Sequence, residues 1–206
     1  MNNARFPFRI IRVLAVMLAG AACLMAQQPQ PSNGARMNHP PRMARARLSP
    51  HETVSQVFDG KRDNRVTIVY GRPYSKDPRS GEERKIWGGL VPYDKVWRLG
   101  ADEATLLIAQ QPLVIGETTI PAGAYTLFML PVESGPSKLI VSKQIGQWGL
   151  QYDEKQDLAR LDLKKETAAK PMAQFTIAIE KNPSGGGVLK LTWENTRFSL
   201  AFTIKP

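Results

Sequence analysis

The residue types most suited to chemistry are concentrated between Tyr70 and Thr105. This segment contains five of the 16 aromatic residues of the chain and four arginines: Tyr70, Tyr74, Trp87, Tyr93 and Trp97, with Arg72, Arg79, Arg84 and Arg98. Aromatic faces supply contact area, and guanidinium groups supply bidentate hydrogen bonds. The combination is typical of a site for a sugar ring, an acidic ligand or a carboxylate terminus.

The sequence offers few routes to catalysis. A Ser/His/Asp triad needs a histidine beside its nucleophile, and His51 is the only histidine after residue 48. No HExxH, Walker, GxSxG or dinucleotide-binding motif occurs. Asp102 and Glu103 are the only acidic pair flanked by aromatic residues and arginines, but neighbours on a strand point to opposite faces, so a two-carboxylate site would need a loop or bulge there. We therefore expect binding rather than catalysis.

Cysteine and histidine are too scarce for several kinds of chemistry. The single Cys excludes a disulfide framework, because no second Cys exists in the chain. One Cys and two His cannot form a Cys/His zinc site. We expect neither a metal nor a cofactor.

A structural role for the same segment is the alternative. Trp87 and Trp97 would then plug the end of the domain, while Arg98 and Glu103 would form an internal ion pair and cap loop carbonyls. Buried pairs of arginine and carboxylate are often structural rather than functional. The sequence leaves both interpretations open.

Alternating apolar residues predict an all-β fold for residues 49–206. Phe198, Leu200, Phe202 and Ile204, for example, alternate with Ser, Ala and Thr and form one apolar face. We expect a single antiparallel β-sandwich or jelly-roll-like domain, with turns roughly every 8 to 12 residues. The expected strands are 54–58, 66–70, 104–109, 113–115, 118–120, 125–130, 138–142, 158–164, 175–179, 189–193 and 198–204.

Two further local patterns accompany the strands. The run Gly185–Gly187, preceded by Ser184, lies between two alternating segments and predicts a hairpin turn with positive φ. Helix is expected to be minor, with one short segment at Lys155–Arg160. No internal repeat and no second folded domain are indicated.

The net charge of +10 arises mainly from the N-terminal part of the chain. The first 48 residues hold seven arginines and no acidic residue, so the remainder carries 21 basic and 18 acidic residues, a net charge of +3. Nucleic-acid binding needs clustered Lys and Arg on one face, and the part expected to fold shows no basic helix or RNA-binding strand motif. We therefore expect no specific nucleic-acid partner.

Residues 1–26 have the order of an export signal. Three arginines precede the apolar run 13–25, which is shorter than the roughly 20 residues of a membrane-spanning helix. Cleavage after Ala26 is preferred to cleavage after Ala22. Lipidation of Cys23 is less favoured, because a glycine stands three residues before it, where lipoprotein signals carry a large aliphatic residue. We expect a periplasmic or extracellular protein without a transmembrane helix.

Residues 27–48 predict a flexible tether. Pro, Gln, Asn and Arg replace any periodic apolar pattern, so the stretch buries too little surface to offset its ordering entropy. The arginines in Arg42–Arg47 could contact an anionic membrane surface weakly, although a solvated linker is the simpler interpretation. The predicted organisation is a signal peptide (1–26), a tether (27–48) and a β-sandwich domain (49–206).

Four ordered motifs in the expected domain match a family pattern: Y-G-R-P at 70–73, G-x-L-V-P-Y at 88–93, W-R-L-G-A-D-E-A-T at 97–105 and I-P-A-G-A-Y-T-L-F at 120–128. The chain from about Leu48 to Pro206 resembles the bacterial domain-of-unknown-function 2911 family, whose members are typically exported and have no established activity. The family pattern has Ser where Gly71 stands and Asn where Asp102 stands. Because an amide is common at position 102, the resemblance weakens Asp102 as a general acid.

Local chemistry and the resemblance together select the candidate ligand-binding residues: Tyr70, Arg72, Arg84, Trp97, Arg98, Asp102, Glu103 and Thr105. We expect non-catalytic binding of a glycan, an acidic small molecule or a partner protein through this surface. The alternative is a hydrolase of envelope or extracellular polymers that uses Glu103 with a second carboxylate or a bound cation. It predicts an open cleft with a second carboxylate roughly 5 to 9.5 Å from Glu103.

Overall fold

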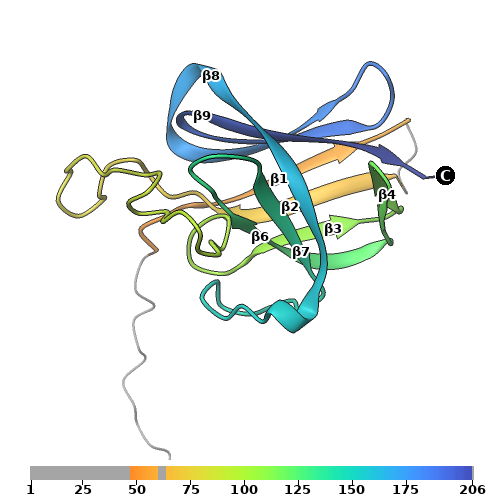
Figure 1. Ribbon diagram of the computed structural model, residues 1–206, viewed down its shortest axis with the longest axis horizontal. Coiled ribbons are helices and arrows are strands. Elements are labelled where there is room, and N and C mark those ends of the chain that lie inside the picture. Colours follow the sequence, from red (N-terminus) through yellow and green to blue (C-terminus); the bar gives the residue numbers. More distant parts are fainter. Residues whose placement is uncertain (1–46, 60–63, 206) are drawn as a thin grey trace, which may run out of the picture. The chain divides into compact units, whose positions relative to one another are not determined.

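The computed structural model describes residues 47–59 and 64–205 (Figure 1). The strands are β1 (His51–Val57), β2 (Arg65–Gly71), β3 (Thr105–Ala109), β4 (Leu113–Ile115), β5 (Thr118–Ile120), β6 (Gly123–Leu130), β7 (Ser137–Ser142), β8 (Asp157–Lys181) and β9 (Gly187–Ile204). A single 3₁₀ turn, Glu154–Gln156, is the only helical element within these ranges, and none there is long and apolar enough to cross a membrane. The predicted signal peptide, Cys23 and nearly all of the predicted tether lie outside the described residues.

One antiparallel sheet contains all nine of these strands, in the order β1-β2-β3-β6-β7-β8-β9-β4-β5, and it is not closed into a barrel. The strand β8 carries the sheet from one layer to the next, because Asp157–Leu163 pair with β7 and Lys164–Lys181 pair with β9. In Figure 1 the hairpin of β8 and β9 lies across β1 and β2. The predicted all-β antiparallel fold is confirmed.

The core lies between the two halves of this folded sheet. Val66, Ile68 and Tyr70 of β2 are buried, whereas the residues between them are less so, as a strand with one buried face requires. The Tyr70 ring meets the Phe175 ring of β8 edge-on, with a centroid distance of 5.8 Å. The alternation seen in the sequence therefore marks the face that each strand turns to the other layer.

Two pairs of predicted strands prove to be single long strands. The segments 158–164 and 175–179 both belong to β8, and the segments 189–193 and 198–204 both belong to β9. Between its two regular parts β8 contains Pro171, and the pairing with β9 changes register there. Because proline has no N–H to donate, an irregular pairing at this point is expected, and it hides the continuity of the strand in the sequence.

The hairpin predicted at the glycine run is confirmed. Gly185 and Gly186 have φ angles of +101° and +69°, and the Asn182 N–H donates to the Gly186 carbonyl at 3.0 Å. A Cβ at position 186 would overlap the backbone of Phe202. The turn therefore requires glycine both for its backbone conformation and for space.

A second buried surface lies on the outer face of β6 and β7. Phe128 and Ile140 are buried there, and the ring of Tyr152 contacts the Phe128 ring edge-on at 4.9 Å. Tyr152 belongs to the 143–156 segment that joins β7 to β8. The Gly149 N–H of this segment also donates to the Asp102 carbonyl, so the segment lies against the residues that precede β3.

Candidate functional site

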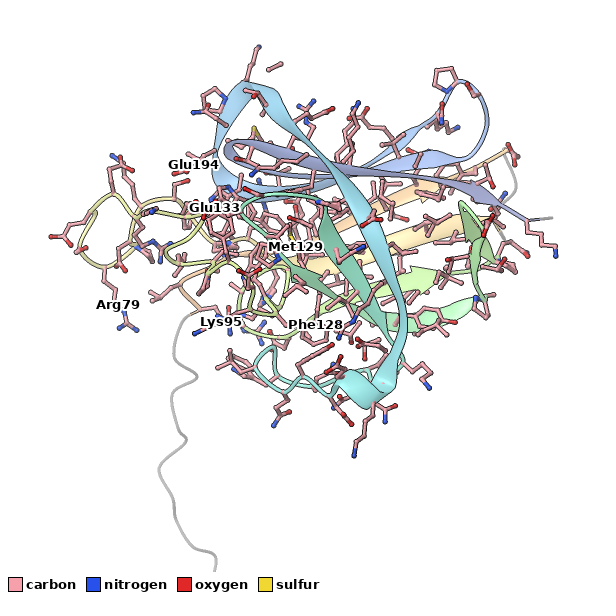
Figure 2. The ribbon with its side chains drawn as sticks, in the orientation of Figure 1. Arg79, Lys95, Phe128, Met129, Glu133 and Glu194 are labelled. Atoms are coloured by element: carbon pink, nitrogen blue, oxygen red, sulfur yellow. The ribbon has the colours of Figure 1, made fainter. Side chains whose placement is uncertain are left out.

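A cavity of about 500 Å³ lies between the 72–104 segment, which joins β2 to β3, and the 143–156 segment. We call it the loop cavity. Six charged side chains line it: Arg79, Arg84, Lys95 and Arg98, with Asp77 and Asp102. Its aromatic lining comes from Tyr74, Trp97, Phe128, Tyr152 and Trp193. In Figure 2 Arg79 and Lys95 both project toward the lower left of the domain. The lining combines an excess of positive charge with aromatic surface.

Trp97 anchors the aromatic part of the loop cavity. Its backbone exchanges hydrogen bonds of 2.7 and 2.8 Å with Met129 of β6. Its indole stacks on Trp193 with a centroid distance of 5.8 Å and meets the Phe175 ring at 5.0 Å. Because Trp193 is fully buried, one side of Trp97 belongs to the core while another side lines the cavity, and the ring is held in place.

Arg98 lines the loop cavity with its end groups available. Its Nε donates to the Gly100 carbonyl at 3.4 Å, and its terminal nitrogens make no hydrogen bond or ion pair with residues 47–59 or 64–205. The side chain runs over Gly149, where an added Cβ would overlap Arg98 Cδ. Glycine at 149 therefore makes room for the arginine beside the cavity, and the terminal nitrogens of its guanidinium group stay free of protein acceptors among the described residues.

Asp102 reaches the same cavity from a constrained backbone. Asp102 and the buried Leu99 both have left-handed φ angles, +63° and +52°. The turn also packs closely on β2, because a Cβ at Gly71 would overlap the Ala101 carbonyl oxygen. The Asp102 carboxylate accepts no hydrogen bond from the described part of the chain, although its Oδ2 is shielded from solvent. Strained backbone recurs at functional sites. The buried oxygen does not by itself distinguish Asp102, because Glu103 Oε2 is also buried without a hydrogen-bond partner.

Arg84 lines the loop cavity but also braces it. Its Nε donates to the Ser75 carbonyl at 3.2 Å, its Nη2 donates to the Tyr74 carbonyl, and its Nη1 lies 3.9 Å from Asp77 Oδ2. The backbone N–H groups of Arg79 and Ser80 lower the pKa of Asp77. Arg84 is therefore mainly a structural clamp on the 74–84 loop.

Two other candidates, Tyr70 and Arg72, form a structural network with Glu52, Thr176 and Ile177. The Tyr70 hydroxyl accepts from the Ile177 N–H at 2.9 Å, and burial raises the Tyr70 pKa to about 12. Arg72 pairs with Glu52 at 2.6 Å and donates to the Thr176 hydroxyl at 2.9 Å. We call these residues, which link β1, β2 and β8, the β2 network.

Thr105 has a similar structural role beside the turn. It is fully buried, and its hydroxyl donates to the Leu99 carbonyl at 2.7 Å. This bond closes the turn between Trp97 and β3, and it satisfies the carbonyl of a residue with left-handed φ. Thr105 therefore positions the cavity wall without reaching the cavity.

Glu103 lies on the other side of the turn from Asp102. It pairs with Arg47, and its Oε2 lies 3.2 Å from His51 Nε2. These three residues line a second hollow of about 330 Å³. The ion pair between Arg98 and Glu103 that the structural alternative predicted does not form, because the two side chains leave the backbone toward different partners. The packing of Trp87 and Trp97 in that alternative is present, with a centroid distance of 6.1 Å.

The contribution of the 143–156 segment to the loop cavity was not apparent from the sequence. Gly149, Leu150 and Tyr152 all line the loop cavity. The Tyr152 hydroxyl donates to Asp157 at 2.7 Å, and burial and this carboxylate raise its pKa to about 12. The one available signal was the run Trp148 to Tyr152, in which aromatic and apolar residues gather outside any strand pattern.

Fold and cavity together define a class: an antiparallel all-β domain that presents a cationic, aromatic-lined cavity between two connecting segments. The family described as "Protein of unknown function (DUF2911)" matches residues 49–202, and the chain belongs to this family. The resemblance seen in the sequence motifs is confirmed by this match. No curated protein and no solved structure matches the chain.

Proposed function

We propose that the domain binds an acidic ligand, either a glycan unit or an acidic small molecule, in the loop cavity and does not convert it chemically. Arg98 carries the proposal. Arg98 lines the cavity, and its terminal nitrogens have no acceptor among the residues that the structure describes. A planar guanidinium with its fork free is suited to bidentate contact with a carboxylate.

The other charged residues of the loop cavity favour an anionic ligand. Arg79 and Lys95 also line the cavity, and no ion pair engages either of them within the described ranges. Asp77 is already held by the N–H groups of its own turn and by Arg84. Asp102 is therefore the one carboxylate left to face three cations, and the resulting positive potential attracts anionic ligands.

A hydrolase function has less support from the geometry. Glu103 is the only carboxylate that lines the second hollow, judged on the described residues. It is engaged by Arg47 and His51 rather than placed beside another acid. Among those residues no group of three or more His, Cys, Asp or Glu side chains is gathered for a metal ion. Binding is therefore the function that the described geometry supports best.

The place of action is part of the proposal. We propose that the protein works in the periplasm or outside the cell, because residues 1–26 have the pattern of an export signal. Weak contact of the tether with an anionic membrane surface would fall to Arg42 and Arg45, since Arg47 pairs with Glu103. Both of these arginines lie outside the described residues.

Thermal shift with a panel of acidic saccharides and small carboxylates, each beside its uncharged counterpart, tests the binding proposal. We expect stabilisation by acidic members only, and a loss of at least about tenfold in affinity in Arg98→Gln, because a charge-assisted hydrogen-bond pair is removed. Glu103→Gln is the matched control, since it changes the same turn on its other side. Absence of stabilisation by every acid, or equal losses in both variants, would contradict the proposal.

A further inference from the structure

The loop cavity presents two unlike groups from one short turn. Arg98 and Asp102 both line it. The turn that carries them is fixed by left-handed backbone at Leu99 and Asp102. It is also held by Gly149, whose N–H donates to the Asp102 carbonyl and whose Cα leaves no room for a Cβ beside Arg98. The positions of the two side chains relative to one another are therefore largely determined before any ligand arrives.

These two groups have opposite charge but do not neutralise each other. Arg98 donates only to the Gly100 carbonyl, and the Asp102 carboxylate receives no donor from residues 47–59 or 64–205, with Oδ2 shielded from solvent. Because an atom that is shielded from solvent is shielded from a ligand as well, Oδ1 is the oxygen through which Asp102 can accept a hydrogen bond from a ligand. A ligand that complements the wall must offer an acid to Arg98 and a hydrogen-bond donor to Asp102.

The charge of the lining favours hydroxyl groups over an ammonium group as that donor. Arg79 and Lys95 add two further cations to the cavity. A zwitterion carries no net charge and would leave this excess of positive charge unbalanced, whereas a hydroxylated acid carries a net negative charge. Hydroxyl donors therefore satisfy Asp102 while the ligand as a whole remains anionic.

The aromatic lining of the loop cavity favours a ligand that contains a ring. Trp97 is held against Trp193 with part of its surface toward the cavity, and Tyr74 is 39% exposed at the same cavity. Flat aromatic faces pack well against the apolar face of a pyranose ring, while the edge of that ring carries the hydroxyls. A cavity of about 500 Å³ lies within the usual range for small-ligand sites.

We propose that the loop cavity binds a uronic acid residue of an acidic saccharide, with the carboxylate on Arg98, ring hydroxyls on Asp102 and the ring face against Trp97. This inference rests on the proposed binding function and narrows its ligand class. It makes Asp102 the residue that selects a hydroxylated acid over a plain one.

Three ring compounds separate the contribution of the negative charge from that of the hydroxyl groups: glucuronate, its methyl ester and cyclohexanecarboxylate. The ester retains the hydroxyls without the charge, and cyclohexanecarboxylate retains the ring and charge without the hydroxyls. Titration calorimetry of the purified protein should show glucuronate binding at least about tenfold more tightly than either analogue. Asp102→Gly should reduce the preference for glucuronate over cyclohexanecarboxylate to about twofold or less, while the acid itself still binds.

Glycine suits position 102 because its φ is positive, so this variant removes the carboxylate without backbone strain. Asp102→Asn, which also tolerates this conformation, serves if Asp102→Gly proves unstable, and it should lower the preference by a smaller factor. Equal affinity for glucuronate and cyclohexanecarboxylate in the unaltered protein, or an unchanged preference in both variants, would overturn the uronic acid assignment and leave acid binding intact. Failure of both acids to bind would instead remove the proposed function.

Discussion

Asp102 and Glu103 are neighbours in the chain, yet they belong to regions of opposite character. On the Glu103 side each of two carboxylates has an arginine partner: Glu103 pairs with Arg47, and Glu52 pairs with Arg72. On the Asp102 side, in the loop cavity, Arg98 and Asp102 face the same space without a matching partner. Under the proposed function, one motif would serve two purposes, holding the domain together on one side and presenting groups to a ligand on the other.

Substitutions in the two regions should affect different measured properties, stability on the Glu103 side and ligand binding on the Asp102 side. Loss of a group whose partner stays buried costs stability, because the partner's hydrogen bonds are not replaced. Loss of a group that has no protein partner costs little stability and should be visible mainly in binding. Changes in the β2 network and at Gly71 should therefore lower the free energy of unfolding, whereas changes of Arg98, which has one long hydrogen bond to the Gly100 carbonyl, should lower it much less.

The largest effect is expected where the turn rests on β2. Gly71→Ala places a Cβ on the Ala101 carbonyl oxygen, so the turn must move, and we expect a loss of about 3 kcal/mol in the free energy of unfolding. Denaturant unfolding measures it. Gly116→Ala is the control, because no atom lies near its Cβ and only the left-handed backbone is disfavoured. Equal losses in the two variants would show that the close packing at Gly71 is unimportant.

Arg72→Met tests the β2 network itself. The change leaves Glu52 without its ion-pair partner and removes bonds to the Phe175 carbonyl and the Thr176 hydroxyl. We expect a loss of about 2.5 kcal/mol in the free energy of unfolding. Arg79→Met, at the loop cavity, should change stability by less than about 0.5 kcal/mol. A reversed order in the same denaturant titration would contradict the division between the regions.

Tyr70 should make the stability of the β2 network depend on pH in the alkaline range. The pKa of Tyr70 is raised to about 12 in the folded protein, mainly by burial, from an ordinary value of 10.0. The folded state therefore holds the proton more tightly, so the associated stability is fully present below pH 10 and is lost as the pH rises toward 12. We expect a loss of about 2 kcal/mol from this group over that interval.

Comparison of unfolding free energies between pH 9 and 12 isolates the contribution of Tyr70. Tyr70→Phe should be less stable than the unaltered protein at pH 9, because the Ile177 N–H loses its acceptor. The unfolding free energy of Tyr70→Phe should nevertheless fall less steeply with pH than that of the unaltered protein. The residual slope includes Tyr152, whose pKa is also raised to about 12. An identical slope with and without the Tyr70 hydroxyl would contradict its assignment to the network.

Gly149→Ala should lower stability less than the changes at Gly71, Arg72 and Tyr70 and should have a clear effect on binding. The added Cβ would overlap Arg98 Cδ and lie 2.8 Å from the Asp102 carbonyl oxygen. We expect a stability loss of about 1.5 kcal/mol, because the Arg98 side chain can shift but the Asp102 carbonyl oxygen belongs to the backbone. The shift should weaken acid binding severalfold in titration calorimetry although no functional group is removed. Unchanged affinity would show that Gly149 does not position Arg98.

Much of the fold was predictable because burial of one strand face leaves a period of two in the sequence. Val66, Ile68 and Tyr70 carry this signal, and the structure places all three in the core. The continuity of β8 through Pro171 was not predictable, because proline weakens the local strand pattern and distant pairing restores the strand. Long-range pairing leaves no mark within the segment itself.

The candidate site was predictable in composition but not in arrangement. The cluster of arginines and aromatic residues located the segment, and the alternation of side chains across a strand indicated that Asp102 and Glu103 would diverge. The roles of Tyr70 and Thr105 could not be foreseen, because their partners Ile177 and Leu99 are set by the packed fold. The 143–156 segment joins the cavity through contacts across more than 40 positions of the chain, as in the bond from Gly149 to Asp102.

The most direct test locates acid binding with the tryptophan side chains as reporters. Trp97 lines the loop cavity, whereas Trp148 bridges to the backbone of Glu103 and lies outside that lining. In an NMR titration of the purified protein with glucuronate, the indole N–H resonance of Trp97 should shift progressively and that of Trp148 should stay in place. A shift confined to Trp148, or a Trp97 shift that persists unchanged in Arg98→Gln, would contradict the account.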